Sequence, residues 1–110
     1  FDLVLSSWGA DFADPINFLS LMSTGNTNNN GGFSDAQYDR DVKKSENQDA
    51  NNPTARYQDL VNAEKRLMTK QGVIPLYQPA TAEMWNAKVS GYVWNPAGMS
   101  RGYQWMKVEK

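Results

Sequence analysis

Apolar residues recur at helical spacing over residues 53–71, and this stretch carries the clearest structural pattern in the sequence. Asn52 and Pro53 are typical of the first residues of a helix, and Gly72 is typical of the residue that ends one. We therefore predict a helix over Pro53–Gln71. Its apolar face comprises Tyr57, Leu60, Val61, Glu64, Leu67 and Met68.

A second helix is predicted from a capping box, in which Ser34 and Gln37 satisfy the free backbone amides of a helix start. This helix should continue to about Glu46 and be anchored by Tyr38 and Val42, which lie one turn apart.

A third, shorter helix is predicted to begin at Asp14 as its N-cap and Pro15 as its first residue. Ile16 and Leu19 give it a buried side. The polar, Asn- and Gly-rich residues 23–32 that follow are predicted to form an exposed loop.

Alternation of apolar and polar residues predicts short strands at Phe1–Trp8 and Val73–Tyr77, the second at a sheet edge because Pro75 lacks an N–H. A looser pattern predicts further short strands at residues 82–87, 91–94 and 103–108. The pattern as a whole predicts an α/β fold with about three helices. It shows no internal repeat and no domain boundary within residues 1–110.

The composition of the 110-residue chain excludes several classes of function. The net charge is -1 and the basic residues are scattered, which argues against a nucleic-acid partner. The chain has no cysteine and no histidine, so disulfides, thiolate nucleophiles, Ser-His-Asp catalysis and His or Cys metal sites are all excluded. No apolar run reaches the roughly 18 residues that a membrane span needs.

The most informative stretch for function is Trp-Gly-Ala-Asp-Phe-Ala-Asp-Pro at residues 8–15. It places Asp11 on a turn close in sequence to Trp8. A carboxylate can bind an ammonium group through charge-assisted hydrogen bonds, and an indole adds cation–π attraction. Asp11 is therefore a candidate receptor for a cation, and the alternative is a turn aspartate that satisfies local backbone amides.

Two other carboxylates and the aromatic residues leave further functions open. Asp11 with Asp14 or Glu64 could form the acid/base pair of a glycoside-acting enzyme, although Asp14 is better explained as a helix cap. Exposed tryptophans could instead form a carbohydrate-binding platform, although such residues more often pack in a core. The candidates are Trp8, Trp85, Trp94 and Trp105.

Several short motifs occur together in one order along the chain. The turn at residues 8–15 is followed by an Asn-rich loop, by Tyr38-Asp39, and then by Arg56-Tyr-Gln-Asp-Leu60, Ala63-Glu64-x-x-Leu67 and Ile74-Pro-Leu-Tyr77. In this order they resemble the C-terminal part of the extracellular solute-binding proteins of the peptide/nickel class, specifically the oligopeptide-binding proteins of ABC importers.

The resemblance implies a fold, a function and a set of partners. It implies that the chain is part of a two-lobed type II periplasmic-binding-protein fold, that it is not an enzyme and that it needs no cofactor. An extended oligopeptide would lie between the lobes, and a membrane permease and the preceding N-terminal portion of the protein would be the other partners. The expected location is the periplasm or the extracellular face of a bacterial membrane, with the whole protein either free or held by a lipid anchor at its N-terminus.

The resemblance also assigns three ligand-binding residues. Asp11 matches the aspartate that pairs with the α-ammonium group of the peptide. Trp8 and Gly9 match turn residues that line the cleft. Phe12 stands where a tyrosine is more common, so a hydroxyl contact is absent at that position.

Overall fold

The computed structural model describes residues 3–95, 97–98 and 101–109, and its contacts divide the chain into two compact units. The helical unit comprises Phe1–Trp8 and Asp14–Pro75, and the hairpin unit comprises Gly9–Ala13 and Leu76–Lys110. These units are defined by contacts and not by sequence boundaries. The prediction that residues 1–110 form one part of a larger two-lobed protein stays a prediction.

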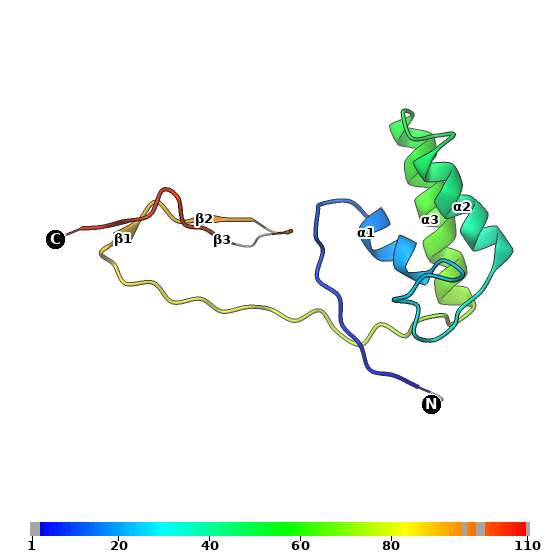
Figure 1. Ribbon diagram of the computed structural model, residues 1–110, viewed down its shortest axis with the longest axis horizontal. Coiled ribbons are helices and arrows are strands. Elements are labelled where there is room, and N and C mark those ends of the chain that lie inside the picture. The colour runs from blue at the N-terminus through cyan, green and yellow to red at the C-terminus, as the bar shows by residue number, and fades with distance from the viewer. Residues whose placement is uncertain (1–2, 96, 99–100, 110) are drawn as a thin grey trace. The chain divides into compact units, whose positions relative to one another are not determined.

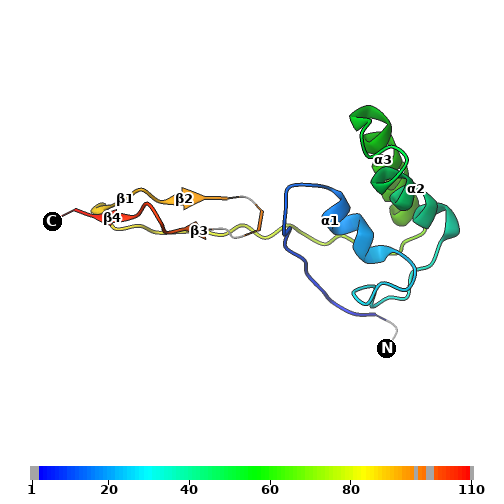
Figure 2. The same cartoon turned by 45° about the horizontal axis from the view of Figure 1, so that its top comes forward.

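The helical unit contains the three α-helices that the described residues form, in agreement with the predicted number. Helix α1 (Ile16–Leu19) continues into a short 3-10 helix, η1 (Ser20–Met22). Helices α2 (Ala36–Glu46) and α3 (Pro53–Thr69) lie side by side, as Figures 1 and 2 show from two directions.

The predicted start of α3 is confirmed and that of α2 is wrong by one residue. The Asn52 side chain accepts the backbone N–H of Ala55 at 3.2 Å, and Pro53 is the first helical residue. Helix α2 is capped by Asp35 instead of Ser34, because the Asp35 carboxylate accepts the backbone N–H groups of Gln37 and Tyr38, both at 2.9 Å.

Asp35 is a stronger cap than Ser34 would be, because its carboxylate also forms an ion pair with Arg66. The Arg66 side chain donates to Asp35, and this bond, with the two backbone N–H bonds, lowers the pKa of Asp35 to about 2. The cap of α2 is thereby tied to the last turn of α3. The Ser34 hydroxyl lies instead 3.1 Å from the hydroxyl of Thr24.

Helix α3 ends in a Schellman motif whose left-handed residue is Gln71, not the predicted Gly72. The Gly72 N–H donates to the Leu67 carbonyl at 3.0 Å, and the Gln71 N–H donates to the Met68 carbonyl at 3.1 Å. Gln71 has φ 54°. Gly72 is needed for space instead, because a Cβ there would lie 2.6 Å from side-chain atoms of Leu67 and Phe33.

Replacing Gln71 with glycine should therefore raise the free energy of unfolding by about 0.5–1 kcal/mol, because glycine adopts positive φ without steric cost. Chemical denaturation of the protein that carries this sequence measures the effect. Lys70→Gly is the matched control: Lys70 has φ -86°, so glycine there should destabilise. Equal effects of the two substitutions on the free energy of unfolding would contradict the left-handed conformation of Gln71.

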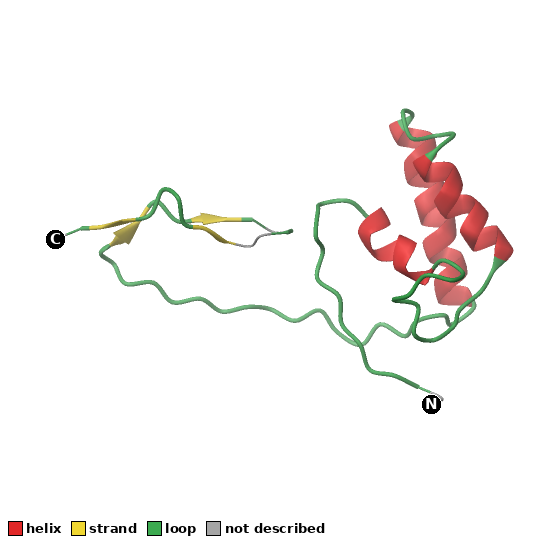
Figure 3. Cartoon of the chain, viewed as in Figure 1, coloured by secondary structure: helices red, strands yellow, loops and turns green. Residues whose placement is uncertain are grey.

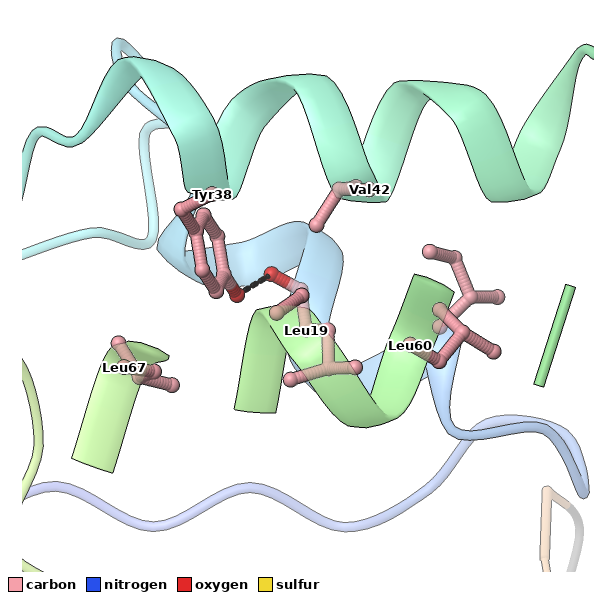
Figure 4. Close-up of a cluster of buried hydrophobic side chains, with 7 residues drawn as sticks. Leu19, Tyr38, Val42, Leu60 and Leu67 are labelled. Atoms are coloured by element: carbon pink, nitrogen blue, oxygen red, sulfur yellow. Dashed lines mark hydrogen bonds between the residues drawn. The ribbon is translucent and has the colours of Figure 1, made fainter. Parts of the chain in front are cut away.

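The core of the helical unit lies between the three helices. Tyr38 is fully buried, and its hydroxyl donates a hydrogen bond to the Leu19 carbonyl, as Figure 4 shows. Burial raises the pKa of the Tyr38 phenol. The Phe33 and Tyr38 rings pack in a T-shaped arrangement with 5.3 Å between their centroids. The cluster of buried hydrophobic residues comprises Ile16, Leu19, Tyr38, Val42, Leu60, Ala63 and Leu67.

The buried stripe of α3 is narrower than predicted. Leu60 and Leu67 are buried as expected, but Tyr57 is 64% exposed and Glu64 is also exposed. Ala63, which the sequence pattern did not select, is completely buried. Because Ala63 is small, it lets α2 and α3 approach closely where the two helices pack together. The larger residues Tyr57 and Glu64 lie outside this contact and are exposed.

The hairpin unit contains two antiparallel strand pairs that follow one another along a single hairpin (Figures 1 and 3). Strand β1 (Val89–Ser90) pairs with β4 (Lys107–Val108), and β2 (Val93–Trp94) pairs with β3 (Arg101–Gly102). Short strands are thus confirmed in this region. Their bounds differ from the prediction: residues 82–87 form no strand, and residues 103–106 contain a turn closed by Met106 N–H and the Tyr103 carbonyl.

One carboxylate holds residues 83–85 to this hairpin. Glu83 accepts hydrogen bonds from both Nε and Nη2 of Arg101, at 3.1 and 2.8 Å, and from the Tyr92 hydroxyl at 2.8 Å. The Arg101 guanidinium lowers the pKa of Glu83. The Trp85 and Tyr92 rings stack with centroids 3.9 Å apart.

Two predicted strands are wrong. Residues 3–8 and 73–77 are not strands, and Leu3 and Leu5, at 84% and 81% exposure, contribute little to burial. Alternation supplies only the side-chain pattern of a strand, whereas the backbone also needs a hydrogen-bonded partner. The described residues provide none for these segments. Residues 1 and 2 of the first one lie outside the described residues.

Candidate functional site

Trp8 is anchored within the helical unit by one side-chain hydrogen bond. Its indole N–H donates to the Asn17 side-chain oxygen at 3.0 Å, and Asn17 is a buried residue of α1. Trp8 as a whole residue is nevertheless 43% exposed. Helix α1 therefore fixes the orientation of a large aromatic side chain that remains accessible. Asn17 was not predicted to be functional, and the only signal for it in the sequence is a polar residue on a short, otherwise apolar helix.

Trp8 also forms one wall of an apolar pocket of about 250 Å³ within the helical unit. Most of the lining residues are hydrophobic, and Glu64 is the one that is charged. The lining comprises Trp8, Phe18, Leu19, Leu21, Met22, Glu64, Leu67, Met68 and Val73. Glu64 lines this pocket and is an exposed residue, although it lies on the predicted apolar face of the helix.

Asp14 has a structural role. Its Oδ1 accepts the backbone N–H of Ile16 at 2.9 Å and the Arg56 guanidinium at 2.9 Å. The hydrogen bond from Arg56 lowers the pKa of Asp14. The Asp14 side chain thus accepts a backbone N–H at the start of α1, but the predicted bounds are wrong by one residue: Pro15 is the N-cap and the helix begins at Ile16. Asp14 joins α1 to α3, and a carboxylate held this way is unsuited to act as a general acid.

Gly9 and Asp11 belong to the hairpin unit, where a turn at residues 9–13 packs against Gly98. The Gly98 N–H donates to the Ala10 carbonyl at 2.8 Å. Gly98 has φ +72°, and a Cβ on it would lie 2.6 Å from the Asp11 carbonyl oxygen. The turn that carries Asp11 is therefore positioned by a close backbone contact that requires glycine.

Within this turn, the Asp11 side chain is exposed to solvent. Gly9 is also exposed, and a Cβ there would meet no atom within 4 Å. The missing side chain at Gly9 therefore leaves open space on the turn, and no close contact with another segment requires glycine at this position. The structure brings Gly9 and Asp11 together on one turn, and it places Trp8 in the helical unit.

The remaining tryptophans are accessible, with Trp94 59% and Trp105 65% exposed, while Trp85 stacks on Tyr92. Their exposure is compatible with the carbohydrate-binding alternative. Across the described ranges, no three carboxylates lie together as a metal site would require. No helix of those ranges is long and apolar enough to cross a membrane.

The known proteins that the chain resembles are named as peptide-binding proteins or as part of an oligopeptide transporter. No protein-family model matches the chain. The dipeptide-binding protein DppE of Bacillus subtilis (strain 168) is 35% identical over 98 residues, which are 89% of the chain and 18% of the relative. The periplasmic murein peptide-binding protein MppA of Escherichia coli (strain K12) is 30% identical over 92 residues, 84% of the chain and 17% of the relative.

A solved structure agrees with these sequence relatives. The substrate-binding domain of an oligopeptide ABC transporter from Bacillus anthracis strain Ames has a TM-score of 0.83 and 29% identity. The match covers 94% of the chain and 20% of that structure. The chain is a homologue of peptide-binding proteins of ABC transporters.

These homologues confirm the resemblance that the motifs indicated, and the partial α/β fold with it. They are binding proteins and not enzymes, so the glycoside-acting alternative is set aside. The chain spans about one fifth of the length of the proteins it matches.

Proposed function

We propose that this chain forms part of the peptide-binding cleft of a solute-binding protein that serves an ABC importer. The homology with peptide-binding proteins over most of the chain is the observation that carries the proposal. The whole protein would have two lobes that close on an extended peptide, whose main chain makes strand-like hydrogen bonds. Recognition through the main chain admits many peptide sequences.

In this proposal Asp11 binds the α-ammonium group of the peptide. Asp11 is an exposed residue, and its turn is positioned by the contact between the Asp11 carbonyl and Gly98. A fixed counter-charge is what a free amine needs on leaving water, because an ionic hydrogen bond offsets part of its desolvation. Trp8 and Gly9, next to one another in sequence, are proposed as cleft residues, with the anchored Trp8 indole as a rigid wall.

The proposed partners follow from the same function. A membrane permease would receive the peptide from the closed binding protein. MppA is named as periplasmic, and we propose a periplasmic or extracellular location for the protein that carries this chain. A lipid anchor would hold it at the membrane where the permease lies.

The test is Asp11→Asn in the protein that carries this sequence. It should weaken the binding of free-amine peptides by about tenfold, because a hydrogen bond to a charged group contributes about 1.5 kcal/mol or more. N-acetylated peptides lack the ammonium group, so their affinity should change little. Isothermal titration calorimetry with a matched pair of peptides measures both.

Glu109→Gln provides the control, because it removes the same charge from an exposed position of the same unit. It should leave both affinities unchanged. Equal losses for the free and the acetylated peptide after Asp11→Asn would contradict the role of Asp11, while peptide binding itself would still support the broader proposal.

A further inference from the structure

The loop between η1 and α2 is drawn in green in Figure 3. One asparagine side chain holds the two ends of this loop together. The Asn29 amide donates to the carbonyls of Met22 at 3.3 Å, Ser23 at 3.3 Å and Phe33 at 2.7 Å, and its oxygen accepts the Phe33 N–H at 3.0 Å. These bonds join the two ends of the loop. We refer to this arrangement as the Asn29 latch.

The next two residues, Asn30 and Gly31, occupy the centre of a turn that the latch supports. The Gly32 N–H donates to the Asn29 carbonyl at 3.0 Å and closes this turn. Asn30 and Gly31 are both exposed. Within the described part of the chain, the Asn30 side chain has no hydrogen-bond partner, and a Cβ on Gly31 would meet no atom within 4 Å.

We propose that Asn30 is a site of spontaneous deamidation, with water as the co-reactant. The Gly31 backbone nitrogen loses its proton and forms a bond to the side-chain carbonyl carbon of Asn30. The bond from that carbon to the side-chain nitrogen breaks, and the nitrogen takes up a proton and leaves as ammonia. Water then opens the cyclic imide at either carbonyl and yields aspartate or isoaspartate.

Asn30 is the one asparagine in the sequence that glycine follows. Glycine has no Cβ to obstruct the attack of its own nitrogen on the preceding side chain, and it leaves the backbone freer to rotate. The asparagines nearby are followed by larger residues: Asn26 by threonine, and Asn28 and Asn29 by asparagine. The reaction should therefore be selective within a loop rich in asparagine.

The Asn29 latch sets the rate of this reaction. The attack requires Asn30 to leave its turn conformation, because nitrogen and side-chain carbon must come into bonding contact. The latch opposes that rotation by fixing the residues on both sides of the turn. Removing the latch should make the reaction faster, whereas a residue larger than glycine at position 31 should make it slower.

Incubation of the whole protein at mildly alkaline pH, followed by peptide mapping with mass spectrometry and enzymatic detection of isoaspartate, tests the proposal. Acidic species should accumulate and map to Asn30. Gly31→Ala should slow their formation several-fold without loss of the fold, because φ at Gly31 is not positive and the space is open. Asn29→Ala should accelerate it several-fold.

Two results would overturn the proposal. One is conversion at another asparagine while Asn30 keeps its amide. The other is an unchanged rate in Gly31→Ala, which would show that the glycine does not select the site. An unchanged or slower rate in Asn29→Ala would refute the part assigned to the latch. Peptide affinity is not used as a readout, so the outcome is independent of the proposed function.

Discussion

Tyr38→Ala should destabilise the helical unit by about 3–5 kcal/mol, the range found when a buried aromatic residue is truncated. Tyr38 is a residue of α2 and is fully buried in the core of the helical unit. The substitution removes its ring from contact with Phe33 and leaves the Leu19 carbonyl without the hydroxyl that satisfies it. Cavity formation and the unsatisfied carbonyl act in the same direction.

Hydrogen exchange of backbone amides in α2 and α3 measures this effect locally, since it reports the free energy of opening of one unit inside a larger protein. Tyr57→Ala is the matched control, because Tyr57 lies on α3 and is 64% exposed. Its effect should stay within about 0.5 kcal/mol. Similar losses of protection in the two variants would contradict the central place of Tyr38 in the core.

Tyr38→Phe separates the two contributions. It keeps the ring and removes the hydroxyl, so the cost should be about 1–1.5 kcal/mol from the lost hydrogen bond to Leu19. A loss as large as that of Tyr38→Ala would mean that the hydroxyl, and not the ring, carries the stability.

Helix positions were predictable because local chemistry determines them. Asn52-Pro53 acts within a few residues, and the structure reproduces this start of α3, although the buried stripe of the helix is narrower than its apolar spacing predicted. The choice between Ser34 and Asp35 as the cap of α2 was not predictable, because it depends on Arg66, which lies far along the chain. Likewise, the positive φ falls at Gln71 because Gly72 is needed where Leu67 and Phe33 crowd the backbone.

The strands were less predictable because pairing is not local. Residues 73–77 have the composition of a strand, yet their backbone has no strand partner among the described residues. Pairing of β1 with β4 depends on residues almost twenty positions apart, and the pattern of apolar residues alone does not report it. The candidate site shows the same limit. Asp11 could be predicted from the local sequence of its turn. Asn17, which positions Trp8, and Gly98, which positions Asp11, could not be predicted, because each contact joins residues that are not neighbours in sequence.

Gly98→Ala should reduce the affinity for free-amine peptides by more than about tenfold, if Asp11 anchors the ligand. Gly98 has φ +72°, where an alanine costs about 1–2 kcal/mol, and its Cβ would lie 2.6 Å from the Asp11 carbonyl oxygen. Backbone atoms cannot move aside as a flexible side chain does. The turn that carries Asp11 must therefore shift, and the hydrogen bond from Gly98 to Ala10 is disturbed with it.

Gly91→Ala and Gly102→Ala distinguish a displaced turn from general destabilisation. Gly91 also has positive φ, and a Cβ there would lie 1.9 Å from the Trp105 carbonyl oxygen, so this variant disturbs the hairpin away from the Asp11 turn. Gly102 lies in β3, its φ is not positive, and a Cβ there would come no closer than 3.5 Å to Val93, which is ordinary van der Waals contact. Calorimetry should show a large affinity loss for Gly98→Ala and almost none for Gly102→Ala.

The acetylated peptide completes the design. If Gly98→Ala acts by moving the Asp11 carboxylate, the variant should lose its preference for the free amine, as Asp11→Asn does, while acetylated peptides bind as before. A loss shared equally by both peptides, and matched by Gly91→Ala, would instead show that the hairpin unit supports the cleft only through its stability. The close contact between Gly98 and Asp11 would then be a packing feature without a part in recognition.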